Sequence, residues 1–206
     1  MESNKTIGKR NETEVLRILR NVGWATSKMV GDWCFYHYKT ENGKCSKAKE
    51  VLKRLEKDGL VLRRKTPKGY NAFILTEAGV ERIKVETGQD WGTNGYALGF
   101  TNEQTLEIVF KQALKLRAEG FIGLLGKPGL RAGLVGEGFK KCDAVAIKVE
   151  NGKYTLKGIV AVANARETNL ERIKDLLQKN VNISLAFGDT ALIKTVQRRL
   201  GIKINF

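Results

Sequence analysis

The sequence predicts an α+β protein of two domains, and three observations support this fold class. The first 88 residues contain three helix-forming stretches followed by two short apolar runs that are joined by a turn. The second half alternates strand-forming and helix-forming stretches, and glycine-rich sequence separates the halves. The predicted domains are therefore residues 1–88 and 101–206, with a linker over 89–100. At 206 residues and 42% hydrophobic content, the chain is long enough for two packed cores.

The first two helices are predicted from apolar spacing and a cap. From Glu14 to Val22 the apolar residues recur at helical spacing and stop at Gly23, which predicts a helix of about three turns. The hydroxyl of Thr26 can accept hydrogen bonds from free backbone N–H groups, so a second helix is expected to begin there. The polar stretch 39–44 is expected to be a loop.

A third helix is predicted from Ser46 to the glycine at position 59, a residue that favours helix C-termini. Val51, Leu52 and Leu55 share its inward face. Its outer faces are strongly basic and carry Lys47, Lys49, Lys53, Arg54 and Lys57. A lysine-rich helix face is often only a solvated surface, so the helix alone does not identify a partner.

A β-hairpin with a basic tip is predicted next. The runs 60–64 and 70–75 flank Thr66-Pro-Lys-Gly69, which has the proline and glycine of a tight turn. Four cations lie in or beside this turn: Arg63, Arg64, Lys65 and Lys68.

The order of three helices, basic hairpin and Leu75-Thr-Glu-Ala-Gly79 resembles winged-helix transcription factors. In those proteins such a step leads from the hairpin, called the wing, into a last helix. The resemblance implies a winged helix-turn-helix domain whose third helix reads the major groove of double-stranded DNA while the wing contacts phosphates. It also allows a protein partner, since a minority of these domains bind protein. The DNA-contact candidates are Lys44, Ser46, Lys47, Lys49, Lys53, Arg54, Arg63, Arg64, Lys65 and Lys68.

The charge of the chain supports a nucleic-acid partner. The net charge is +15, and it is shared, because residues 1–88 hold 19 Lys and Arg against 11 Asp and Glu, and residues 89–206 hold 18 against 11. A protein this basic should bind nucleic acid with a strong dependence on salt. A ribosomal or membrane-surface role would share the charge, but neither predicts the hairpin.

The cysteines, the single histidine and the hydropathy of the chain exclude several classes of protein. Cys34, Cys45 and Cys142 form no metal-ligand spacing and suit a reduced, cytoplasmic protein. His37 is the only histidine, which excludes histidine-rich metal sites and nucleases that need paired histidines. No apolar run approaches about 18 residues, so no membrane partner is expected.

The second half is expected to be an α/β sheet with helices packed on it. A helix capped by Thr101 or Asn102 should end at Gly120, and an irregular glycine-rich segment should occupy 123–138. The remaining predicted elements are strands over 143–149 and 154–163, a helix over 170–179, a strand over 181–187, a helix over 190–200 and a strand over 202–206.

This order resembles the PD-(D/E)xK nuclease core, that is, a restriction-endonuclease-like domain. The whole chain resembles the replication-relaxation or MobC-like family of mobile-element proteins, which join a winged helix to such a core. Lys141-Cys-Asp143 matches the family's Pro-Asp before a strand, and the strand 158–166 matches the one that carries Glu-x-Lys. The resemblance implies Mg²⁺ held by the aspartate and the glutamate. Ala161 and Ala163 stand where that glutamate belongs.

Two functions follow. The first is a sequence-specific double-stranded DNA-binding protein of a plasmid, phage or other mobile element, without a cofactor, acting in transcription regulation or in assembly of a transfer or replication complex. Arg166, Lys140 and Lys141 would then contact phosphates. The second is an active Mg²⁺-dependent nicking enzyme, whose carboxylates would come from Asp143, Glu107, Glu137 and Glu167. Whether the protein forms a homodimer or joins a relaxase or replication proteins is left open by the sequence.

Overall fold

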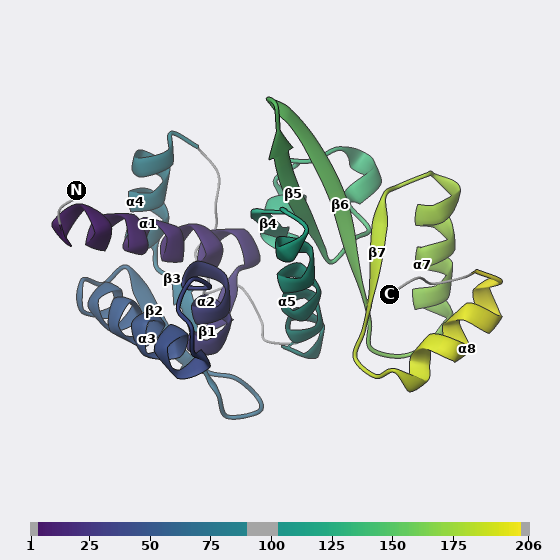
Figure 1. The fold of residues 1–206 in the computed structure, drawn as a ribbon, viewed down its shortest axis with the longest axis horizontal. Helices are drawn as coiled ribbons and strands as arrows, with labels where there is room; N and C mark the ends of the chain where they lie inside the picture. The colour runs from purple at the N-terminus through teal and green to yellow at the C-terminus, as the bar shows by residue number, and fades with distance from the viewer. Residues whose placement is uncertain (1–3, 90–102, 203–206) are drawn as a thin grey trace. The chain divides into compact units, whose positions relative to one another are not determined.

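The structure is a computed structural model that describes residues 4–89 and 103–202 (Figure 1). It is a mixed α+β structure with two β-sheets. The chain divides into two compact units, Met1–Thr101 and Asn102–Phe206. Nearly all of the predicted linker over 89–100 lies outside the described residues, and so does the predicted last strand after Ile202.

The first unit contains four described helices, which are α1 (Asn4–Val22), α2 (Ser27–Cys34), α3 (Glu41–Lys57) and α4 (Glu77–Thr87). The predicted start of α1 was wrong, because the helix begins about ten residues before Glu14. These additional residues are mostly polar, so they lengthen the helix without extending its apolar stripe. The cap of α2 is confirmed, since Thr26 Oγ1 accepts a hydrogen bond from Met29 N at 3.3 Å.

The predicted loop at 39–44 was wrong from position 41 onward, because α3 begins at Glu41 rather than at Ser46. Thr40 caps the helix, with its Oγ1 accepting from Gly43 N at 3.0 Å. The cap, together with the negative charge of Glu41 in the first turn, favours a helix start despite the low helix propensity of Gly43. Lys44 and Ser46 therefore lie within the first two turns of α3.

The first sheet has the strand order β1-β3-β2 and is antiparallel throughout, with β1 at Trp24–Thr26, β2 at Val61–Lys65 and β3 at Asn71–Leu75. The hairpin prediction is confirmed: Gly69 has φ +83°, and its N–H donates to Thr66 O at 2.8 Å. Strand β1 was not predicted, because three residues between two helices are too short to show a period of two.

Two close backbone contacts fix α3 and the hairpin within this unit. A Cβ atom at Gly31 of α2 would lie 2.9 Å from the carbonyl oxygen of Lys44, so only glycine allows α2 to approach the start of α3 this closely. A Cβ atom at Gly79 of α4 would lie 2.1 Å from Leu60 O, directly before β2.

The second unit contains α5 (Glu103–Ala118), β4 (Gly123–Gly126), α6 (Lys127–Arg131), a 3₁₀ turn (Glu137–Phe139), β5 (Ala144–Glu150), β6 (Lys153–Val162), α7 (Glu167–Gln178), β7 (Ile183–Phe187) and α8 (Ala191–Leu200). The prediction of an irregular segment over 123–138 was wrong, since this segment contains β4 and α6. Strand β4 has glycine at both ends and only two apolar residues between them, which conceals it from pattern analysis.

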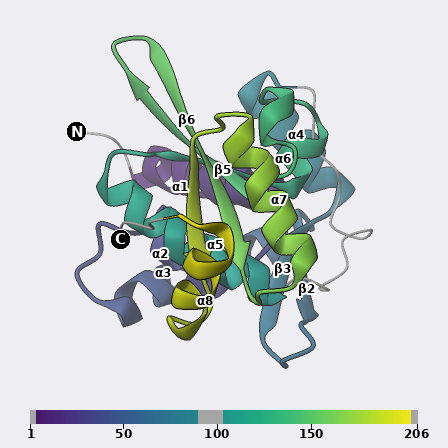
Figure 2. The same cartoon turned by 90° about the vertical axis from the view of Figure 1, so that its right-hand side faces the viewer.

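The second sheet has the order β4-β5-β6-β7. Its first two pairings are antiparallel, whereas β6 and β7 are parallel and are connected through α7. Figures 1 and 2 show α7 and α8 beside β6 and β7. A parallel pair needs such a helical crossover, because a short turn reverses the chain direction.

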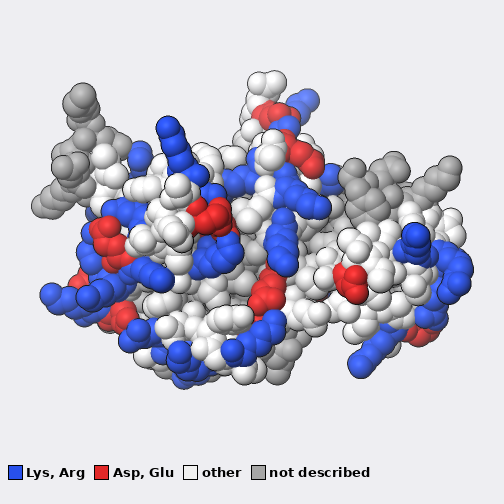
Figure 3. All heavy atoms as spheres, turned by 60° about the horizontal axis from the view of Figure 1, so that its bottom comes forward, with Lys and Arg blue, Asp and Glu red and all other residues white. Residues whose placement is uncertain are grey.

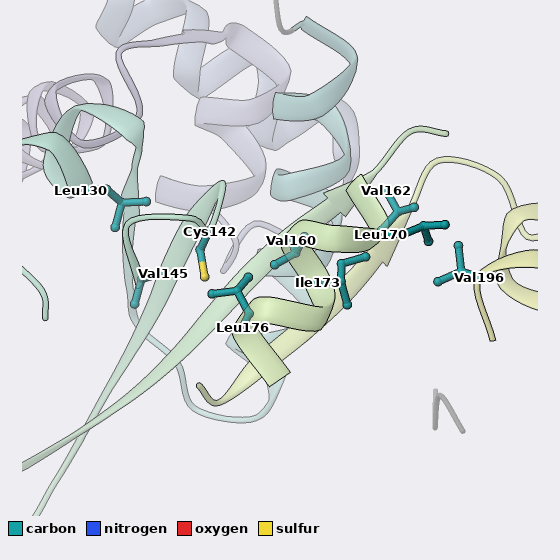
Figure 4. Packing of buried hydrophobic residues seen from close by; sticks show 9 residues of the cluster. All are labelled: Leu130, Cys142, Val145, Val160, Val162, Leu170, Ile173, Leu176 and Val196. Carbon is teal, nitrogen blue, oxygen red and sulfur yellow. The ribbon is translucent and has the colours of Figure 1, made fainter. Parts of the chain in front are cut away.

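Alternate residues of this sheet face different layers. Val145 and Val160 pack against Leu170, Ile173 and other residues of the core in Figure 4. On the opposite face, Gln112 of α5 donates a hydrogen bond to Ser184 of β7 at 2.9 Å. The core shown in Figure 4 consists of Leu130, Cys142, Val145, Val160, Val162, Leu170, Ile173, Leu176 and Val196.

Candidate nucleic-acid interface

One face of α3 is exposed along its whole length. Its members recur every three or four residues, which places them on one side of a helix. The opposite side is buried in the first unit through Ala48, Val51, Leu52 and Leu55. The exposed residues of this face, called the α3 face below, are Asn42, Ser46, Lys49, Lys53 and Lys57.

The cations of α3 fall into two groups. Lys49 and Lys53, and also Lys57 in the last turn, are exposed and make no ion pair within residues 4–89 and 103–202. Lys47 and Arg54 lie beside the α3 face and both pair with Glu50 at 3.0 Å. A cation that already has a carboxylate partner must give up that partner to contact a phosphate. Lys49 and Lys53 are therefore the best-placed cations of this helix for DNA.

The start of α3 carries a second, separate ion cluster. Lys44 and Lys28 each lie 2.9 Å from an oxygen of Glu41. These hydrogen bonds, the one from Lys44 most strongly, lower the pKa of Glu41 to about 2. Lys44, a predicted DNA-contact residue, is thus engaged within the protein, with its side chain only 20% exposed.

The hairpin places its four predicted cations differently. Arg63 pairs with Glu56 of α3 at 3.3 Å, and Arg64 on β2 is half-buried. Lys65 and Lys68 are exposed at the tip, where Lys65 Nζ donates to Gly69 O at 3.2 Å. The tip therefore carries most of the accessible charge of the hairpin.

Glu12 of α1 connects the helices that support the α3 face. Its carboxylate lies 2.9 Å from Arg82 of α4 and 3.4 Å from Arg54 of α3. This link was not predicted, because charge pairs between different helices leave no periodic signal in a sequence. The pairs of Glu50 with Lys47 and Arg54 lie within α3 at i,i+3 and i,i+4 spacing, so the sequence contains their signal. Figure 3 shows that Lys and Arg cover more of the displayed surface than Asp and Glu.

In the second unit, Asp143 lies directly before β5 and its side chain is 7% exposed. Oδ2 accepts a hydrogen bond from Ala161 N on β6 at 2.8 Å. Arg172 of α7 donates to both carboxylate oxygens, each at 3.1 Å, and Lys127 Nζ lies 3.5 Å from Oδ1. Both Arg172 and Lys127 were missed as partners, since only the fold brings them to Asp143.

These surroundings do not fit Mg²⁺, which needs several oxygen ligands in near-octahedral geometry. Asp143 has two cations beside it, and its neighbour on β6 is Ala161, which offers no carboxylate. Within residues 4–89 and 103–202, no group of three His, Cys, Asp or Glu residues is arranged to hold a metal ion.

The other candidate carboxylates have separate surroundings. Glu137 pairs with Lys140 at 2.5 Å, and Glu167 pairs with Arg199 of α8. Glu107 is half-buried on α5.

Of the predicted phosphate contacts, Lys141 is held by Asp175 at 3.0 Å, whereas Arg166 is exposed before α7.

Comparison with known proteins identifies no relative: no family model, curated protein or solved structure matches this chain. None of the helices in the described ranges is long and apolar enough to cross a membrane.

Proposed function

We propose that the protein binds double-stranded DNA in a sequence-specific manner through a winged helix-turn-helix domain formed by the first unit. The observation that carries this proposal is the α3 face, on which Lys49, Lys53 and Ser46 are exposed together. An α-helix fits the major groove, where lysine and serine side chains can bind base edges or phosphates.

The arrangement around the α3 face supports the proposal. Helix α2 packs closely on the start of α3 at Gly31, as the first helix of a helix-turn-helix does on the second. The hairpin β2–β3 adds Lys65 and Lys68 at its tip, where they would act as the phosphate-contacting wing. Asn42 and Ser46, near the N-terminus of α3, supply groups that discriminate between bases.

For the second unit, we propose a restriction-endonuclease-like domain that no longer cleaves. The position of Asp143 before β5, beside Ala161 on β6, supports this assignment, and its pairing with Arg172 and Lys127 is unfavourable for a divalent cation. The proposed function requires no cofactor. A role in a mobile element, in transcription regulation or in a transfer or replication complex, remains a prediction, as do a homodimer and contacts with relaxase or replication proteins.

Selection from a random duplex library with the full chain tests this function. We expect one short motif to be enriched and bound about 10³-fold or more tightly than a scrambled duplex of the same length, a ratio typical of specific DNA-binding proteins. Hydroxyl-radical footprinting should then protect the enriched motif. Equal binding of selected and scrambled duplexes would contradict sequence specificity.

A further inference from the structure

The second unit contains a basic hollow that the proposed DNA contacts of the first unit do not use. It has a volume of about 420 Å³ and is lined by Lys127, Leu130, Arg131 and Lys140. Three of its four lining residues are cations. They come from α6 and from the turn before β5, two segments that the sheet brings together.

We propose that this hollow binds the phosphate group of a nucleotide without a metal ion. Arg131 makes no ion pair or side-chain hydrogen bond within the described part of the chain, so its guanidinium is available for a ligand. Guanidinium and ammonium groups bind phosphate by charge-assisted hydrogen bonds, and arginine can do so with two N–H groups at once.

The carboxylates nearby offset only part of the positive charge of the hollow. Asp143 is bound by Arg172 through two hydrogen bonds and also forms an ion pair with Lys127 at 3.5 Å, so a phosphate would share Lys127 with a carboxylate that Arg172 already balances. Glu137 balances Lys140, in a surface pair whose side chains are 50% exposed for Lys140 and 83% exposed for Glu137. Such an exposed pair contributes little free energy, so a phosphate can displace Glu137.

The backbone around the hollow is held in place before any ligand binds. A Cβ atom at Gly129 would lie 2.4 Å from Leu125 Cδ2, so glycine allows α6 to pack closely on β4. Lys127 Nζ donates to Cys142 O at 2.5 Å, and Leu130 is buried in the core. A site that is already ordered loses less conformational entropy on binding.

The hollow has room for a ligand larger than an isolated phosphate ion. Its volume lies within the range of about 300–1,000 Å³ that is usual for small-molecule sites. A phosphate that carries a sugar and a base would fill it better, and such a group is present both in a free nucleotide and in a DNA strand. This inference does not depend on DNA binding by α3.

Titration of the ¹⁵N-labelled full chain followed by NMR tests the proposal. The probes are inorganic phosphate, thymidine 5′-monophosphate and single-stranded hexathymidylate. We expect saturable shifts of the amides at 127–140, with a nucleotide bound more tightly than inorganic phosphate. Tighter binding of the monophosphate would identify a free nucleotide as the ligand, and tighter binding of hexathymidylate would identify a DNA strand.

The variant Arg131→Ala/Lys140→Ala should bind the probe at least tenfold more weakly than the wild type does. Its matched control is Lys153→Ala/Arg198→Ala, which removes the same charges from exposed positions on β6 and α8, and it should bind as the wild type does. Each spectrum also reports whether the variant is folded. Equal weakening in both variants, or no saturable shift at 127–140 with any probe, would overturn the proposal. Shifts confined to 41–70 would also overturn it while leaving DNA binding by the first unit intact.

Discussion

Arg172 binds Asp143 through two hydrogen bonds of 3.1 Å, one from each terminal guanidinium nitrogen to each carboxylate oxygen. Arg172 also donates to Ala161 O at 3.2 Å, so it joins the start of β5 to β6. The aspartate that resembles a nuclease metal ligand is therefore part of the packing of the second unit. Both carboxylate oxygens accept a hydrogen bond from the Arg172 guanidinium, so a metal ion would have to compete with it.

The first prediction is that Asp143→Ala lowers the free energy of unfolding by about 3 kcal/mol, because it leaves the largely buried Arg172 without its partner. Urea denaturation measures this change. The double variant Asp143→Leu/Arg172→Met should recover most of the loss, because an apolar pair removes both charges. If Asp143→Ala unfolds at the same urea concentration as the wild type, the pair has no structural role.

The second prediction is that the wild-type chain does not cleave supercoiled or linear DNA with Mg²⁺ or Mn²⁺. The physical reason is that Asp143 is held by two cations and has Ala161 beside it. Agarose gels of plasmid after long incubation provide the measurement. Metal-dependent nicking that disappears in Asp143→Asn would contradict the prediction and would make Glu107, Glu137 and Glu167 the next residues to replace.

The third prediction concerns the hairpin. Lys65→Ala/Lys68→Ala should reduce the slope of log affinity against log salt by about 1.8, since each lost phosphate contact removes about 0.9 on B-form DNA. Arg63→Ala should have a smaller effect, because Arg63 pairs with Glu56. Fluorescence anisotropy at several salt concentrations gives these slopes, and equal slopes for Lys65→Ala/Lys68→Ala and the wild type would exclude backbone contact by the tip.

The fourth prediction is that Glu50→Gln tightens DNA binding about two- to fivefold at low salt. Hydrogen bonding by Lys47 lowers the pKa of Glu50, so this side chain is negatively charged at neutral pH and engages both Lys47 and Arg54. Its replacement removes a charge that would repel DNA and releases Lys47, whereas Arg54 keeps its pair with Glu12 at 3.4 Å. Glu171→Gln, which removes an equal charge from the exposed surface of α7, is the control; the same gain in both variants would show only an effect of net charge.

Local signals in the sequence are sufficient to predict much of the secondary structure of the first unit. The sequence predicts the cap at Thr26 and the hairpin turn that ends at Gly69, because both depend on neighbouring residues only. The start of α3 was misplaced because Gly43 lowers helix propensity, whereas the cap at Thr40 decides the outcome. The short strands β1 and β4 were missed because they are stabilised by pairing with β3 and β5, which are distant in sequence.

The site was only partly predictable for the same reason. Lys49 and Lys53 could be assigned to the outer surface of α3 from their spacing. That Arg172 binds Asp143 depends on side chains that the fold brings together. The pairs of Lys44 with Glu41, and of Lys47 and Arg54 with Glu50, lie within α3 at i,i+3 and i,i+4 spacing, so the sequence already contains their signal. A prediction from charge alone therefore includes more DNA-contacting residues than the structure leaves unpaired and exposed.

The most direct test of the proposed DNA interface is the affinity of Lys49→Ala/Lys53→Ala for the duplex selected by the wild type, measured by fluorescence anisotropy. The control is Lys111→Ala/Lys115→Ala, which removes two exposed lysines with the same i, i+4 spacing from α5. We expect the α3 variant to bind at least about tenfold more weakly, with a lower salt slope for each lysine that contacts a phosphate and reduced discrimination for each that contacts a base. Unchanged affinity of the folded α3 variant, or the same loss in the α5 control, would contradict the assignment of α3 as the DNA-reading helix.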